Sequence, residues 1–342
     1  MQELPFELGP IRPVDEAKSL LIRTTRGCSW NRCEFCTAYK EMPFSMRSLE
    51  EIKSDIAAAA KYYDGQSFES CFLQDGNSFI MKTGELVELL GFLKQHFPTL
   101  KRISSYGRAR TVRRKGPEEL KEICAAGLNT LYCGMESGSD TVLKKMRKGS
   151  TAADMIASGL MAKQAGMTVS EFIILGLGGQ ELWQEHATET AAVLNKINPH
   201  FIRALTIGVK AGSGMAKQME AGEYTLQTEK NIIEEQRLLI EHLDGISSYY
   251  ANHHGVDLLM EARGQLPEDK PKLLAIMDRY LSLPEDDRLN YTLGKRIGYY
   301  QVLDDMQDEG RKRHVAAQVR EVNDSYPGRF DEVCHHLRQQ VV

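Results

Sequence analysis

Strand-like and helical segments alternate six times between residues 18 and 215, and this alternation constrains the fold most strongly. The predicted strands are residues 19–27, 67–74, 101–106, 129–135, 167–176 and 200–208. The segments between them place apolar residues at helical spacing, as the leucines between residues 86 and 93 show. Parallel strands need such crossover connections, so the sequence predicts an α/β fold with a parallel sheet. An open doubly wound sheet and an incomplete (β/α) barrel both fit this pattern.

Local signals mark several helix ends and a change of pattern toward the C-terminus. A capping box beginning at Ser48 predicts the start of the first helix. Pro117 and Gly127 bracket a third helix, since proline suits the first helical turn and glycine the residue after the last. From about residue 225 the chain is rich in Glu, Lys and Leu at helical spacing. We therefore expect an N-terminal arm over 1–17, a β/α core over 18–215 and a mainly helical C-terminal extension over 216–342.

Length and composition bound the class of protein. The 342 residues suggest about two domains, or one barrel with an extension. A net charge of −4 argues against a surface that coats nucleic acid, although a local basic patch is compatible with it. No apolar run is long enough to span a membrane, and residues 1–18 lack the basic and apolar regions of a signal peptide. We expect a cytoplasmic protein.

Glycines and single polar residues follow each of the six predicted strands. In parallel β/α folds, ligands bind at the carboxyl ends of the strands, in the loops that lead into the helices. Turn chemistry explains some of these glycines, but their recurrence in all six loops favours one shared ligand site. The residues of interest in these loops are Cys28, Cys33 and Cys36, then Asp75 and Asn77, Arg108 and Arg110, Glu136, and Gly176.

Three of the seven cysteines, Cys28, Cys33 and Cys36, fall within nine residues. In a chain without a secretion signal, such a cluster more often binds metal or does redox chemistry than forms disulfides. A structural zinc site would need a fourth ligand, and no second paired motif is evident. The spacing C-x4-C-x2-C also occurs in plant-type ferredoxins, which use a fourth distant cysteine. A 4Fe–4S cluster held by three thiolates would instead leave one iron open to a substrate or cofactor.

The segment RTTRGCSWNRCEFCTAYK resembles the cluster loop of the radical S-adenosylmethionine (radical SAM) superfamily, with one residue more between Cys28 and Cys33 than the commonest spacing. LQDGNSF resembles the strand-two motif of that family, which contacts the amino group of SAM, and FIILGLGGQE resembles its strand-five glycine motif. GMESGSDTVLKKMRKG is similar to the strand-four segment of an anaerobic branch. That branch is related to methylthiotransferases, oxygen-independent coproporphyrinogen oxidase and cobalamin-dependent members.

The resemblance implies a partial (β/α)6 TIM-like barrel that uses a 4Fe–4S cluster and SAM. The cluster would be held by Cys28, Cys33 and Cys36, and its reduction would cleave SAM to a 5′-deoxyadenosyl radical that acts on an unknown substrate. A reductant such as flavodoxin or ferredoxin is an implied partner. The implied SAM contacts are Phe35 on the adenine, carboxylates and amides at Asp75, Asn77 and Glu136, one of Arg108 and Arg110 at the carboxylate, and the backbone of Gly176.

Several of these residues also have a purely structural interpretation. Asp75 is a candidate helix cap, and an arginine-rich stretch is usually a solvated face, so we expect only one of Arg108 and Arg110 to point inward. Cys71, Cys124 and Cys133 lie in apolar contexts and are predicted to be small buried hydrophobic residues. The C-terminal segment YYANHH, which includes His253 and His254, is predicted to be a polar loop between helices.

Overall fold

The computed structural model describes residues 4–340 and divides the chain into two compact units. Unit 1 comprises Met1–Met135 and Arg147–Glu171, and unit 2 comprises Glu136–Met146 and Phe172–Val342. The domain limits predicted at residues 18 and 215 stay a prediction. Within the described part of the chain, no helix is long and apolar enough to cross a membrane.

Unit 1 contains four parallel strands in the order β1-β4-β5-β6. Their register pairs Leu20 with Cys71, and Cys71 in turn with Ile103. The predicted parallel sheet is therefore confirmed in this unit. The strands span Leu20–Arg23 (β1), Ser70–Gln74 (β4), Arg102–Tyr106 (β5) and Leu128–Glu136 (β6), and the first half of β7 (Thr168–Leu175) also belongs to unit 1.

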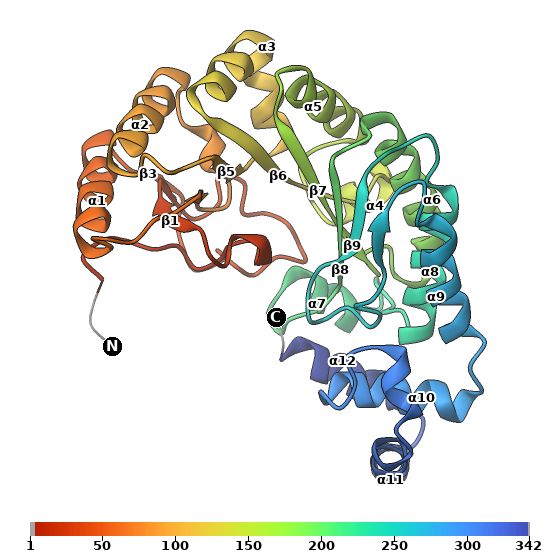
Figure 1. The fold of residues 1–342 in the computed structure, drawn as a ribbon. Helices are drawn as coiled ribbons and strands as arrows, with labels where there is room; N and C mark the ends of the chain where they lie inside the picture. Colours follow the sequence, from red (N-terminus) through yellow and green to blue (C-terminus); the bar gives the residue numbers. More distant parts are fainter. Residues whose placement is uncertain (1–3, 341–342) are drawn as a thin grey trace. The chain divides into compact units, whose positions relative to one another are not determined.

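The helices of unit 1 cover one face of these strands (Figure 1). They are α1 (Leu49–Tyr62), α2 (Thr83–His96), α3 (Ala109–Ala126) and α5 (Ala152–Gln164). Alternate strand residues such as Ile22 and Leu73 pack against the buried helix residues Ile56 and Leu90. The intervening residues face the other way, because side chains alternate along a strand, and there Phe72 makes an edge-to-face contact with the Tyr106 ring.

The predicted helix signals are confirmed in part. Ser48 caps α1 with the full capping box, and Gly127 ends α3 in a left-handed conformation. The predicted helix start at Pro117 is confirmed, although a further helical stretch that was not predicted precedes it within α3 and begins at Ala109. The chain leaves helical geometry at Gly116 (φ 77°) and resumes it at the proline. A proline has no N–H to continue the hydrogen bonds of the preceding turn, so the chain kinks before it and a new helical stretch begins at Pro117.

The N-terminal arm, with a short 3-10 helix η1 at Val14–Glu16, is anchored to the strands of unit 1. Glu16 is fully buried and accepts hydrogen bonds from Arg102 (Nη1, 2.7 Å), the Tyr132 hydroxyl (2.7 Å) and the Ser104 hydroxyl (2.9 Å). A buried carboxylate is tolerated only with such compensation. The arm therefore contributes polar groups to the sheet face that the helices do not cover.

Unit 2 is mainly helical, as predicted for the C-terminal part of the chain. Its helices are α4 (Asp140–Lys145), α6 (Gly179–Ile197), α7 (Gly214–Glu220), α8 (Glu229–His242), α9 (Lys270–Leu281), α10 (Glu285–Arg296), η3 (Leu303–Gln307), α11 (Glu309–Ser325) and α12 (Phe330–Gln339). Strand β8 (Phe201–Thr206) pairs in parallel with β9 (Tyr249–Asn252), and β10 (Arg263–Gln265) pairs antiparallel to β9. The prediction of a polar loop is thus wrong for residues 249–252, where aromatic residues favour a strand.

Candidate metal centre and cofactor site

The three clustered cysteines lie on one loop, residues 27–44, which follows β1. The chain enters the loop from β2 (Thr25–Arg26) and leaves it through β3 (Ser45–Met46), and these two short strands pair antiparallel. At its first residue, Gly27 has φ 74°, and a Cβ there would lie 3.0 Å from the Met42 carbonyl oxygen. Only glycine fits this start of the loop without strain.

Cys28, Cys33 and Cys36 are all half-buried. Among residues 4–340, no group of three or more His, Cys, Asp or Glu side chains lies close enough together to hold a single metal ion. The fit to an iron–sulfur cluster rests on the donor set, because thiolates are the ligands of such clusters and each binds a different iron atom. The predicted burial of Cys71 and Cys133 is confirmed, whereas Cys124 is only partly buried.

Asp75 ties the end of β4 to the start of the cysteine loop. Its Oδ2 accepts hydrogen bonds from Arg23 (Nη2, 2.6 Å; Nε, 3.0 Å) and from the Gly27 backbone N–H (3.0 Å). Burial raises the pKa of this carboxyl, while the Arg23 charge opposes the shift. The alternative role of helix cap does not apply, since the 3-10 helix that follows has Asn77 at its N-cap position. A contact between Asp75 and SAM stays a prediction.

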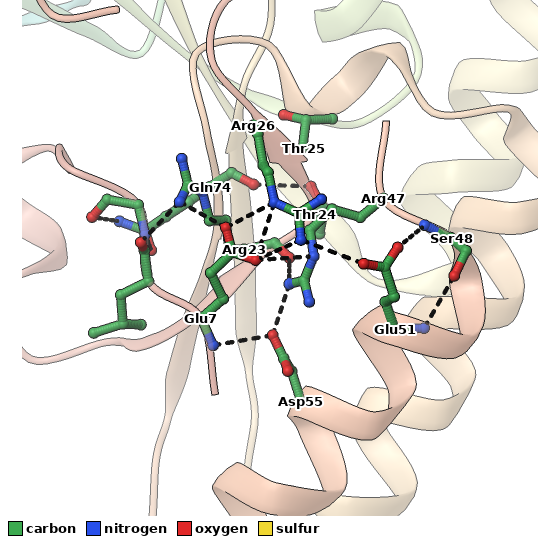
Figure 2. Close-up of polar contacts among 12 residues, drawn as sticks. Glu7, Arg23, Thr24, Thr25, Arg26, Arg47, Ser48, Glu51, Asp55 and Gln74 are labelled. Carbon is green, nitrogen blue, oxygen red and sulfur yellow. Dashed lines mark hydrogen bonds and ion pairs between the residues drawn. The ribbon is translucent and has the colours of Figure 1, made fainter. Parts of the chain in front are cut away.

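The N-terminal arm reaches the same region through Glu7 (Figure 2). The Glu7 carboxylate pairs with Arg23 (Nη1, 2.7 Å) and Arg26 (Nη2, 2.7 Å), the residue directly before the glycine that opens the loop. Its backbone N–H donates to Asp55, whose carboxylate also pairs with Arg47 (2.6 Å). The arm, β1, the two-stranded ribbon and α1 are thus joined by one set of ion pairs beside the cysteine loop.

Asn77 connects three segments of the candidate site. The side chain is fully buried, and its Nδ2 donates to the hydroxyls of Ser29 and Thr111, both at 2.9 Å. Its Oδ1 accepts from the backbone N–H of Arg108 (3.1 Å). In this structure Asn77 therefore holds the cysteine loop, the end of β5 and the start of α3 together.

The two candidate arginines lie in different surroundings. Arg108 is half-buried, and its guanidinium stacks 5.0 Å from the Trp30 ring centre. Burial lowers the pKa of Arg108, and negative charge on Cys28 and Cys33 opposes this shift, so the guanidinium lies within electrostatic range of two of the thiols. Arg110 is exposed and pairs instead with Asp154 (3.2 Å). Only Arg108 lies beside the cysteine loop.

The segment around residue 148 packs against the tip of the cysteine loop. The Trp30 indole N–H donates to the Arg147 carbonyl oxygen (2.7 Å), and the Arg147 side chain pairs with Glu34 (3.1 Å). The Lys148 ammonium lies 6.0 Å from the ring centre of Phe35, which is half-buried. The ring predicted to contact adenine is therefore partly accessible and borders a basic segment.

The two remaining predicted site residues, Glu136 and Gly176, belong to unit 2. Glu136 ends β6 with φ 65°, an uncommon left-handed conformation for a residue other than glycine. The backbone N–H of Gly176 donates to Glu235 (2.8 Å), and its carbonyl accepts from the Tyr224 hydroxyl. Full burial raises the Glu235 pKa to about 8. Both polar groups of the Gly176 backbone are thus fixed by buried side chains.

Comparisons with known proteins place this chain in a family. The sequence model of the radical SAM superfamily matches residues 22–191, a range that contains the cysteine loop and β4 to β7. An uncharacterized methyltransferase of Pyrococcus horikoshii is 25% identical over 195 residues, which cover 55% of this chain and 40% of that protein. The chain belongs to the radical SAM superfamily, whose members are enzymes.

Solved structures of the same superfamily share the fold. Coproporphyrinogen III oxidase of Escherichia coli superposes with a TM-score of 0.53 at 16% identity, over 66% of this chain and 52% of that one. A cobalamin-dependent SAM radical enzyme superposes with a TM-score of 0.51 at 14% identity, over 94% of this chain and 57% of that one. The chain thus spans about half the length of these proteins. The predicted partial (β/α) barrel with a helical C-terminal region is confirmed as the fold class.

Proposed function

We propose that the protein is a radical SAM enzyme in which Cys28, Cys33 and Cys36 hold a 4Fe–4S cluster. The observation that carries this proposal is the loop after β1, which presents three half-buried thiols in a chain of this superfamily. The ribbon of β2 and β3 closes the base of the loop, and Asp75 fixes its first residue. These contacts would pre-organise the thiols for one cluster, since ligands need such support from the residues around them.

The cysteines elsewhere in unit 1 favour an open coordination position over a fourth thiolate. Cys71 and Cys133 lie in the core between strands and helices, where burial raises the pKa of both thiols. Cys124 is in α3 and packs against the same core. A thiol that is hard to ionise and packed among apolar groups is a poor metal ligand. An iron without a protein thiolate can instead bind SAM.

When bound, the reduced cluster would supply one electron to the sulfonium of SAM, breaking its bond to C5′ and giving methionine and a 5′-deoxyadenosyl radical that takes a hydrogen atom from the substrate. We assign Arg108 to the SAM carboxylate, because its guanidinium lies beside the thiols whereas Arg110 is paired with Asp154. Phe35 would pack on the adenine. The assignments of Asp75, Asn77, Glu136 and Gly176 to SAM rest on the resemblance of their motifs.

The electron would come from a low-potential donor such as flavodoxin or ferredoxin. The substrate is not assigned. Because the Pyrococcus horikoshii relative is named a methyltransferase, methyl transfer is the first reaction to assay. Formation of 5′-deoxyadenosine is nevertheless the sharper test, because it depends on the cluster and SAM and not on the substrate class.

The test is anaerobic reconstitution of the full chain with iron and sulfide. We expect about four iron atoms per chain, an electron paramagnetic resonance (EPR) spectrum of the reduced cluster that changes on addition of SAM, and release of 5′-deoxyadenosine under reduction. A chain that takes up zinc but no iron would overturn the proposal in favour of a zinc-stabilised module. An iron cluster whose EPR spectrum does not change on addition of SAM would support an electron carrier instead.

Replacing Arg108 by glutamine is expected to weaken SAM binding while the cluster is retained. A charge-assisted hydrogen bond to the SAM carboxylate contributes about 1.5–3 kcal/mol, so Arg108→Gln should raise the Kd for SAM roughly 10- to 150-fold. Titration of SAM into reconstituted protein, followed by the EPR spectrum of the reduced cluster, measures the change. Samples are compared at equal iron content.

Arg110→Gln is the matched control, because it removes an equal charge two residues away on the same segment. Its guanidinium is exposed and bound to Asp154, so SAM affinity should stay within about twofold of the unmodified protein, as for a surface ion pair of small net energy. Equal Kd values for both variants would remove Arg108 from the SAM site.

A further inference from the structure

Tyr39 follows the third cysteine of the loop by three residues and is held in one position. The residue is 3% exposed. Its backbone carbonyl accepts hydrogen bonds from the Asn31 side chain (2.6 Å) and the Met42 backbone N–H (3.1 Å). A residue fixed at its backbone and buried at its side chain has little freedom to turn its ring away.

The Tyr39 ring packs against the strand-end glycine that faces the first cysteine. A Cβ placed at Gly76 would lie 2.9 Å from Tyr39 Cε2 and 3.2 Å from Cys28 Cβ. Both side chains therefore converge on the space that the glycine leaves free. A larger residue at position 76 would force one of them to move, which gives this glycine a packing reason beyond its conformational freedom.

The Tyr39 hydroxyl is buried and has no hydrogen-bond partner anywhere in residues 4–340. Buried tyrosine hydroxyls usually find a partner, and leaving one unpaired costs about 1–3 kcal/mol. Burial raises the pKa of this phenol, and negative charge on Asp75, Tyr106, Cys28 and Cys36 raises it further. The hydroxyl thus remains a proton donor, and two of the three candidate cluster ligands lie within its electrostatic range.

We propose that the Tyr39 hydroxyl donates a hydrogen bond to a sulfur of the cluster, either a ligating thiolate or a bridging sulfide, and thereby raises the reduction potential of the cluster. This inference rests on the proposed cluster at Cys28, Cys33 and Cys36. A hydrogen bond to sulfur stabilises the reduced form more than the oxidised form, because the reduced cluster carries one more negative charge. Tyr39 would therefore ease the uptake of the electron.

Tyr39→Phe removes the hydroxyl and keeps the ring, so iron content and cluster absorption should stay normal. In a redox titration of the full, reconstituted chain without SAM, monitored by EPR, the ratio of reduced to oxidised cluster at a fixed potential should fall roughly 3- to 10-fold. For a one-electron couple this corresponds to a midpoint about 30–60 mV lower, at 59 mV per tenfold. Replacing Tyr39 by 3-fluorotyrosine, a stronger donor of similar size, should shift the midpoint the opposite way.

Tyr132→Phe is the matched control, because its buried hydroxyl is already bonded to Glu16 at 2.7 Å. That variant should leave the midpoint unchanged. A four-iron cluster whose midpoint is the same in unmodified, Tyr39→Phe and fluorotyrosine protein would overturn the inference and leave the cluster itself intact. A change in the Kd for SAM alone, with an unchanged midpoint, would also overturn the inference, because the hydroxyl would then face SAM and not the cluster. Absence of a four-iron cluster from the unmodified chain would reject the proposed function as well.

Discussion

Single replacement of Cys28, Cys33 or Cys36 by alanine is expected to abolish binding of the cluster. Each thiolate holds one iron atom, and the remaining two cannot retain a cube that already has one open iron. Iron content should fall from about four atoms per chain to less than one, with loss of the cluster absorption, while the melting temperature of the metal-free protein stays close to that of the unmodified chain. Because all three residues are half-buried, their replacement by alanine removes little packing in the core.

Cys124→Ala and Cys334→Ala are the controls for this experiment. Cys124 is half-buried in α3, and Cys334 is buried in α12, where burial raises the pKa of its thiol. Both variants should keep the iron content of the unmodified protein. Loss of iron from either would show that a fourth thiolate completes the site, as in a ferredoxin. Full iron content in any of the three loop variants would remove that cysteine from the ligand set.

The local signals of the sequence predicted most of unit 1 because each has a short-range physical cause. The capping box of Ser48 and Glu51 satisfies backbone groups within one turn, so a four-residue pattern suffices to predict the start of α1. The strands at β4, β5 and β6 follow from apolar residues that face the helices. The predicted strand 19–27 is interrupted at Thr24, whose backbone N–H and hydroxyl both bond to the Gln74 carbonyl. The strand is therefore interrupted by a contact with β4, which is distant in the sequence and gives no local signal.

The candidate site was predictable where spacing carries the chemistry and not where tertiary contacts do. The three cysteines are recognised from their spacing. The sequence also predicted that only one of Arg108 and Arg110 points inward, but it did not indicate which of the two. Arg23 carried no signal of its own, since its partner Asp75 lies 52 residues away. Tyr39 likewise became a candidate only when its hydroxyl proved to be buried and unpaired within residues 4–340.

Replacing Glu229 by glutamine is expected to destabilise unit 2 by about 3 kcal/mol at neutral pH. Its carboxylate, at the start of α8, pairs with Arg296 of α10 (2.6 Å) and Arg338 of α12 (3.0 Å), and all three side chains are at most 5% exposed. Despite burial, the two guanidinium groups lower the Glu229 pKa to about 2. The difference between the ordinary pKa of 4.5 and the folded-state pKa of about 2 corresponds to about 3 kcal/mol of stability. The melting temperature should fall by roughly 6–12 °C.

The pH dependence of this contribution follows from the direction of the shift. Because the folded-state pKa lies below the ordinary value of 4.5, the stabilisation is fully present above that pH. It is lost as the pH falls from about 4.5 through about 2. The difference in free energy of unfolding between unmodified protein and Glu229→Gln should therefore be largest above pH 4.5 and shrink below it. Urea titrations at a series of pH values measure this difference.

The control lies on α12, the helix that carries Arg338, where Glu332 forms an exposed pair with Arg329. Glu332→Gln should change stability by less than about 1 kcal/mol, because solvent screens surface pairs.

The buried pair of Glu229 and Arg338 behaves differently, since removing one partner leaves an uncompensated charge and not merely a missing contact. Arg338→Met in the Glu229→Gln background should accordingly cost less than the sum of the two single changes, with a coupling of about 1–3 kcal/mol. Additive losses would show that Glu229 stabilises unit 2 by packing and not by its charge.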